Sequence, residues 1–94
     1  MINFDQTRLV KVCQENDISF LGVFGSVARG DYRSESDVDL VARFDKQKSL
    51  FDLILIEDRL KEVFHRDVDL LTEKSISPYL KDQIEADLQQ LYVH

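Results

Sequence analysis

The stretch of sequence that decides the fold runs from residue 18 to residue 40 and reads ISFLGVFGSVARGDYRSESDVDL. Its residues before Gly25 are apolar and rich in β-branched and aromatic side chains, which predicts a buried strand that ends at this glycine. Residues 26–29 predict the start of a helix, and residues 31–36 are polar enough for a loop. Alternating apolar and polar residues then predict a second strand at 37–44. The chain is thus expected to pass from strand to helix to loop to strand within one short segment.

The turn between the first strand and the helix is a candidate phosphate site. Gly25 and Ser26 stand where free backbone N–H groups meet a helix N-terminus, and Ser26 adds a hydroxyl group. Arg29, in the first turn of that helix, is long enough to reach a phosphate, although an arginine here is about as often a surface residue or a partner contact. Taken alone, a Gly-Ser turn is most often only a connection between strand and helix.

Two carboxylates on the second strand form a candidate metal site. Asp37 and Asp39 are two residues apart, so their side chains share one face of the strand. Like charges at this spacing repel one another unless a cation offsets them, so the pair indicates a metal ion. A third carboxylate is available on the strand predicted at residues 67–71, where Asp67 and Asp69 face the same side. We prefer Asp69, because the two residues that follow it echo those that follow Asp39.

Length and composition narrow the class of protein. The chain has 94 residues, of which 44% are hydrophobic and 32% charged, and this balance predicts one globular domain over residues 1–94. A formal net charge of −6 argues against stable binding to nucleic acid and favours a basic protein partner. The single cysteine excludes an internal disulfide and a cysteine-based zinc site. The apolar run at 53–56 is too short for a membrane span and residues 1–5 lack the basic flank of a signal peptide, so we expect a cytoplasmic location without membrane contact.

Helical segments alternate with the strands along the rest of the chain, which predicts one α/β unit. Capping signals predict three helices. The first covers residues 4–16, where Asn3 and Gln6 resemble a capping box, and the second covers residues 50–64 and begins with Ser49 and Asp52. The last helix begins at Ser77 and Pro78 and is expected to continue to about Tyr92. In the helix at 50–64 the apolar residues cover more than one face, so that contact with a partner is expected as well.

These motifs together resemble a known family. Gly25-Ser26, followed after ten intervening residues by Asp37 and Asp39, is similar to the signature of the DNA polymerase β-like nucleotidyltransferase superfamily. The fuller strings, GSVARG at 25–30 and SDVDL at 36–40, resemble those of its minimal nucleotidyltransferases (the MNT family), and the resemblance covers nearly the whole chain. It implies an α/β nucleotidyltransferase fold, with a mixed sheet of three or more strands flanked by helices.

The resemblance also implies a chemistry for the site. Asp37 and Asp39 are implied to bind Mg²⁺, with two ions expected beside the nucleotide, and Asp69 to supply the third carboxylate. Gly25 and Ser26 are implied to hold the phosphates of ATP, and Arg29 is a further candidate there. Asp69 also has the chemistry to accept a proton from a hydroxyl acceptor.

Three functions stay open on the sequence. The leading expectation is a Mg²⁺-dependent antitoxin of a type VII-like pair, which transfers AMP from ATP to a tyrosine of a cognate HEPN ribonuclease toxin and inactivates it within a hetero-oligomer. A second is an antitoxin that masks the toxin without catalysis. A third is nucleotidyl transfer to a small hydroxylated molecule. A chain of this length leaves no room for a separate acceptor domain, so a partner is expected to complete the acceptor pocket.

Overall fold

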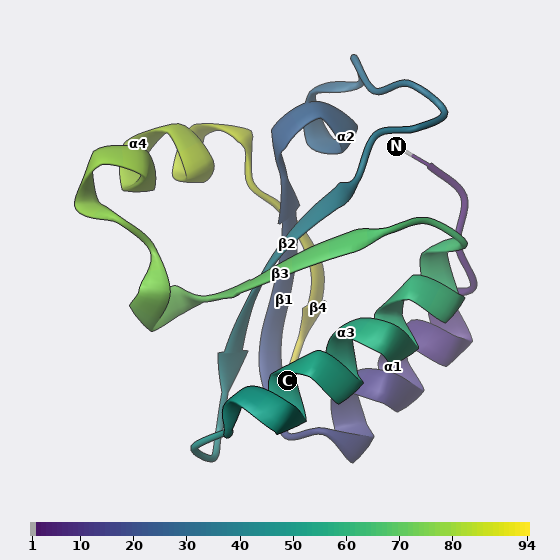
Figure 1. Ribbon diagram of the computed structural model, residues 1–94, viewed down its shortest axis with the longest axis vertical. Coiled ribbons are helices and arrows are strands. Elements are labelled where there is room, and N and C mark those ends of the chain that lie inside the picture. The colour runs from purple at the N-terminus through teal and green to yellow at the C-terminus, as the bar shows by residue number, and fades with distance from the viewer. Residues whose placement is uncertain (1) are drawn as a thin grey trace.

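A four-stranded mixed sheet of order β3-β2-β1-β4 forms the centre of the protein (Figure 1). The computed structural model describes residues 2–94, so the first residue of the predicted domain lies outside the described residues. In chain order the elements are α1 (Gln6–Glu15), β1 (Ile18–Phe24), α2 (Gly25–Arg29), β2 (Val38–Phe44), α3 (Leu50–Phe64), β3 (Val68–Thr72), the 3-10 turn η1 (Glu73–Ser75), α4 (Pro78–Asp87) and β4 (Gln89–Val93). Strand β1 runs antiparallel to β2 and β4, whereas β2 and β3 are parallel. This confirms the predicted mixed sheet with flanking helices.

One face of the sheet is buried and determines where the site can lie. Helices α1 and α3 lie side by side against this face, while α4 lies on the opposite side of the sheet and contacts β1 and α2 (Figure 1). Val38 and Leu40 of β2 are fully buried in the core beneath α1 and α3. Because side chains alternate along a strand, Asp39 between them points to the other face. The carboxylates are therefore kept apart from the apolar core.

Capping groups set the helix starts, and two of the three predicted caps are confirmed. Asp52 N–H donates to Ser49 Oγ at 3.1 Å, and Ser49 N–H donates to Asp52 Oδ2 at 2.9 Å, which completes a capping box at α3. At α4 the Ser77 hydroxyl accepts from the Tyr79 N–H at 3.3 Å, with Pro78 as the first helical residue. Local side-chain chemistry is therefore enough to place these two starts.

The predicted cap of the first helix is wrong. Asn3 and Gln6 do not form the capping box that their spacing suggested, because α1 begins only at Gln6. Asp5 is the cap instead, and its Oδ1 accepts from the Arg8 N–H at 3.2 Å. The carboxylate directly before the helix is better placed than the amide two residues earlier.

The end of the last helix is also different from the prediction. We expected the helix to continue to about Tyr92, but α4 ends at Asp87 and the chain becomes strand β4. Leu88 takes an extended backbone conformation, and the following residues pair with the free edge of β1. Leu91 and Tyr92 pack against the core from this strand. The open edge of β1 offers backbone hydrogen bonds and apolar contact, which together outweigh the helical spacing of the apolar residues.

Helix α3 carries apolar residues beyond those that it buries. Four near its start are exposed, namely Leu50 (74%), Phe51 (80%), Ile54 (50%) and Leu55 (63%), while Leu60 further along has no exposed surface. Apolar residues therefore cover more than one face of α3, as expected, and contact of this surface with a partner stays a prediction.

Two further expectations concern the membrane and the cysteine. Among residues 2–94 none of the helices is both long enough and apolar enough to cross a bilayer. Cys13 is buried on α1, and this burial raises the pKa of its thiol to about 12. The thiol is therefore a core group and not a nucleophile.

We expect the buried and the exposed leucines of α3 to differ strongly in their contribution to stability. Leu60→Ala leaves a cavity in the core and should lower the free energy of unfolding by about 2–5 kcal/mol. Leu50→Ala on the same helix removes an exposed side chain and should change it by less than about 0.5 kcal/mol. Urea unfolding of both variants measures the difference, and equal losses would contradict the described core.

Candidate active site

The predicted site residues meet at one end of the sheet, where β1 ends and β2 and β3 begin. Phe24, the last residue of β1, pairs with Asp39 of β2, and Asp39 pairs in the parallel register with Asp69 of β3. Gly25 follows Phe24 directly and begins α2, which lies over this end of the sheet (Figure 1). Three neighbouring strands therefore bring together the glycine turn and two of the three predicted carboxylates, and Asp37 stands immediately before β2.

Gly25 is needed at this turn for two reasons. Its φ of +75° lies in the left-handed region, which side chains with a Cβ rarely adopt. A Cβ at this position would also collide with the Oδ2 atom of Asp39, so the glycine lets the carboxylate pack against the turn. Within residues 2–94 no side chain caps the start of α2, which leaves the N–H groups of its first turn, including that of Ser26, for a ligand.

Asp39 is the carboxylate whose ionisation the fold disfavours most clearly. Burial raises the pKa of Asp39 above its ordinary value of 3.8, and the negative charges of Asp69 and then Asp37 raise it further, while the positive charge of Arg29 opposes them. The three carboxylates therefore act on one another through space. A bound cation beside Asp39 would remove this repulsion.

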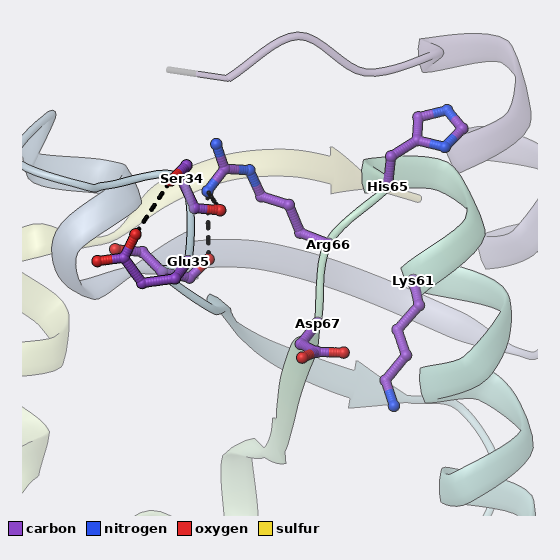
Figure 2. Close-up of a pocket in the computed structure, with 7 residues that line it drawn as sticks. Ser34, Glu35, Lys61, His65, Arg66 and Asp67 are labelled. Atoms are coloured by element: carbon purple, nitrogen blue, oxygen red, sulfur yellow. Dashed lines mark hydrogen bonds between the residues drawn. The ribbon is translucent and has the colours of Figure 1, made fainter.

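The geometry separates Asp69 from the alternative Asp67. Asp69 lies beside Asp39 in the strand register, and its charge acts on Asp39. Asp67 instead lines a pocket between α3 and the loop before β2, together with Lys61 and Arg66 (Figure 2). The structure thus brings Asp69 and not Asp67 next to Asp39, and the role of Asp69 in the reaction stays a prediction.

The carboxylates fit magnesium that arrives with a nucleotide better than a metal cage made by the protein alone. Among the described residues no three His, Cys, Asp or Glu side chains are arranged to hold a metal ion by themselves. Mg²⁺ is usually bound by one or two carboxylates, with water and substrate phosphates as its other ligands. Asp39 with Asp37 or Asp69 offers such a donor set beside the glycine turn. The oxygen ligands of these residues therefore suit Mg²⁺, and magnesium binding stays a prediction.

Arg29 has protein partners in this structure. Its Nη1 lies 2.7 Å from Asp87 Oδ2 at the end of α4, and its Nε lies 3.3 Å from Asp31 Oδ2. The hydrogen bonds to these carboxylates raise the pKa of Arg29. Close by, Gln89 Nε2 donates to the Ala28 carbonyl oxygen at 2.9 Å. The end of α4 and the start of β4 thus hold α2 in place. Contact of Arg29 with a phosphate, which would replace one of these partners, stays a prediction.

One residue of the site region was not found from the sequence. Arg66, between α3 and β3, reaches toward the loop that leads into Asp37 (Figure 2). Its place directly before the strand that carries Asp69 is the only local signal, and a basic residue at the end of a helix is more simply explained by the helix dipole. Its contacts depend on a loop about 30 positions away and are not visible in local sequence.

Comparison with known proteins shows the family to which the chain belongs. The family model named Nucleotidyltransferase domain matches residues 7–91. The chain therefore belongs to the nucleotidyltransferase domain family, and the prediction of an enzyme of this class is confirmed.

Individual proteins of known name are similar to this chain in sequence or in fold. MJ0435 of Methanocaldococcus jannaschii, provisionally named a protein adenylyltransferase, is 36% identical over 83 residues, which are 88% of this chain and 89% of the relative. A chain of a toxin–antitoxin complex crystallised with AMP-PNP superposes with a TM-score of 0.80 at 22% identity, covering 96% of this chain and 74% of that one. A chain from the complex of tri-AMPylated Shewanella oneidensis HEPN toxin with its MNT antitoxin gives 0.70 at 20% identity, covering 95% and 70%. The two structural likenesses confirm the fold.

Two glycines with similar backbone strain allow the turn to be tested. Gly25→Ala and Gly30→Ala both place a Cβ at a left-handed φ, of +75° and +83°, and this backbone strain alone should cost each variant about 1–2 kcal/mol of stability. Only at Gly25 does the new methyl group collide with Asp39, whereas at Gly30 it meets open space. Calorimetric titration with Mg²⁺-ATP should show a strongly weakened affinity for Gly25→Ala alone. Equal affinity in the two variants would place the phosphates elsewhere.

The raised pKa of Asp39 makes a prediction about stability and pH. Because folding raises this pKa, ionised Asp39 destabilises the folded state, and the penalty is absent below the ordinary pKa of 3.8 and develops as the pH rises through the folded pKa. Asp39→Asn carries no charge, so its Tm should exceed that of the wild type at pH 7, and the difference should vanish near pH 3. Asp82→Asn, at an exposed position on α4, is the control and should leave Tm unchanged at both pH values. A lower Tm for Asp39→Asn at pH 7 contradicts the described electrostatics.

Proposed function

We propose that this protein is a Mg²⁺-dependent adenylyltransferase that moves AMP from ATP to a tyrosine of a HEPN ribonuclease toxin and so acts as its antitoxin in a type VII-like pair. The observation that carries the proposal is the contact between the uncapped glycine turn and Asp39, beside Asp69, in a chain of the nucleotidyltransferase family. Its similarity to a protein named for adenylyl transfer to proteins, and to chains of toxin–antitoxin complexes, supports this acceptor.

The transfer is an in-line displacement at the α-phosphorus of ATP. Gly25 and Ser26 would hold the phosphates through backbone N–H groups and the serine hydroxyl. The tyrosine oxygen forms a bond to the α-phosphorus while the bond to the bridging oxygen breaks, and pyrophosphate leaves with that oxygen. The hydroxyl proton, whose pKa is about 10 in an ordinary tyrosine, passes to the Asp69 carboxylate and then to water. AMP remains on the acceptor through a phosphodiester bond.

Three aspartates would hold the magnesium ions that this chemistry uses. Asp37 and Asp39 would bind them together with the nucleotide phosphates, and Asp69 would complete the set on the acceptor side. When bound, Mg²⁺ supplies positive charge that stabilises the attacking and leaving oxygens of such a displacement. The mutual repulsion of the carboxylates around Asp39 is the feature of this chain that supports the assignment.

The acidic character of the chain supports a basic partner. A formal net charge of −6 complements the positive surface that a ribonuclease needs to bind an RNA backbone. AMP attached near that surface adds negative charge and bulk, which oppose RNA binding even after the two proteins separate. Complex formation and covalent modification therefore both favour a hetero-oligomer of this acidic chain with a basic ribonuclease toxin.

We expect the product of the neighbouring gene to be a HEPN toxin and this protein to add AMP to it. After incubation with ATP and Mg²⁺, intact mass spectrometry should show added AMP on the toxin, and peptide mapping should place it on a tyrosine. The toxin should stay inactive after this chain is removed. The Asp37→Asn, Asp39→Asn double variant should lose transfer, and Asp82→Asn should retain it.

Other outcomes of the same experiment identify the alternatives. If the double variant neutralises the toxin fully, and the toxin exposed to wild type shows no mass change, the protein is an antitoxin that masks its partner and not an enzyme that modifies it. Turnover of ATP with a small hydroxylated acceptor and an unmodified toxin would point to a small-molecule transferase.

A further inference from the structure

The loop that leads into Asp37 is held by the side chain of Arg66, which lies between α3 and β3. Arg66 Nη1 donates toward three carbonyl oxygens of this loop, those of Arg33 at 2.7 Å, Ser36 at 3.3 Å and Ser34 at 3.4 Å. Figure 2 shows the guanidinium group pointing into the loop, whereas Lys61 and His65, which line the same pocket, point away from it. One cation therefore gathers several carbonyl dipoles of the loop at a single point.

The loop itself is folded so that its carbonyl groups can meet at this point. Arg33 N–H donates to Ser36 Oγ at 2.8 Å, and Ser36 N–H donates to the Arg33 carbonyl oxygen at 3.1 Å, which closes a turn. The Arg66 guanidinium carbon also lies 5.1 Å from the centre of the Tyr32 ring, in a cation–π contact. These contacts give Arg66 a fixed position and give the loop one conformation.

The same segment holds the backbone on both sides of Asp37. Arg66 binds the carbonyl oxygen of Ser36, and the carbonyl oxygen of Asp67 accepts from the Val38 N–H at 2.9 Å. Asp37 itself stands just outside β2, which begins at Val38, so the sheet ladder does not extend over it. Its exposed side chain can be placed only through its backbone. Two consecutive residues, 66 and 67, thus set the position of Asp37 relative to β3, the strand that carries Asp69.

We propose that Arg66 is a positioning residue that fixes Asp37 beside Asp39 and Asp69 for metal and nucleotide binding. The inference rests on the proposed function, because it assigns the fixed geometry to the predicted metal site. Arginine suits this task better than lysine, since its planar guanidinium binds separated carbonyl groups and stacks on Tyr32 at the same time. Arg66 contacts no reacting atom in this proposal and acts only through the loop.

The test compares Arg66→Gln, Arg66→Lys and the control Lys61→Gln, which removes a positive charge from the same pocket without touching the loop. Hydrogen exchange should accelerate at the amides of residues 33–38 in Arg66→Gln, to a smaller extent in Arg66→Lys, and not in Lys61→Gln. A Mn²⁺ titration, followed by paramagnetic broadening of the Asp37 and Asp39 amide NMR signals, should show about 10–100-fold weaker metal binding in Arg66→Gln. The kcat/KM for AMP transfer should fall by a similar factor, and Arg66→Lys should recover part of both losses.

These readouts separate the inference from the proposed function. If Mn²⁺ broadens the Asp37 and Asp39 signals of the wild type but the protein transfers no AMP, the proposed function is contradicted. The positioning role of Arg66 is then still tested by hydrogen exchange and by Mn²⁺ affinity. Faster exchange with unchanged Mn²⁺ affinity makes Arg66 a purely structural residue and overturns the proposal. Unchanged exchange, or no broadening of these signals in the wild type, overturns it as well.

Discussion

The close approach of the Asp39 carboxylate to the Gly25 turn is the constraint on which the rest of the structure depends. Three carboxylates repel one another here, and the sheet nevertheless keeps Asp39 between the turn on one side and Asp69 on the other. Only a backbone without a Cβ at residue 25 permits this contact. The unfavourable charge is confined to the sheet face away from α1 and α3, where Asp37 and Asp69 are exposed and Asp39 is partly exposed.

The buried face of the sheet supplies the stability that offsets this repulsion. Helices α1 and α3 pack over one continuous apolar core, which contains no buried polar or charged residue among the described residues. The face that carries the carboxylates can therefore keep like charges together without placing an unpaired charge in the core. Such a division between a stabilising face and a strained functional face is common where a site is arranged for a charged ligand.

Two long-range connections hold the ends of the site. On one side, the ion pair of Arg29 with Asp87 fastens α2 to the end of α4. The hydrogen bond from Gln89 to the Ala28 carbonyl oxygen fastens α2 to the start of β4. On the other side, Arg66 fastens the loop before β2 to the start of β3. Both connections use an arginine whose partners lie far away in the sequence. The glycine turn and the loop before Asp37 are thus held by contacts with residues distant in the sequence.

Local features of the sequence determined the parts of this protein that need only neighbouring residues. The Ser49 and Ser77 caps, the strand that ends directly before Gly25 and the strand that carries Asp39 follow from side-chain chemistry and from backbone periodicity within a few residues. The same motifs were sufficient to indicate the nucleotidyltransferase family and its mixed sheet.

The tertiary structure decided what depends on pairing between distant segments. The residues after Asp87 fit a helix by their spacing, but the open edge of β1 makes them a strand. Alternation alone cannot distinguish Asp67 from Asp69, and it is the parallel register of β2 and β3 that places Asp69 beside Asp39. Strand register and contacts across some 30 to 60 positions are set by how apolar faces and free backbone groups are satisfied in three dimensions, and no local pattern records that choice.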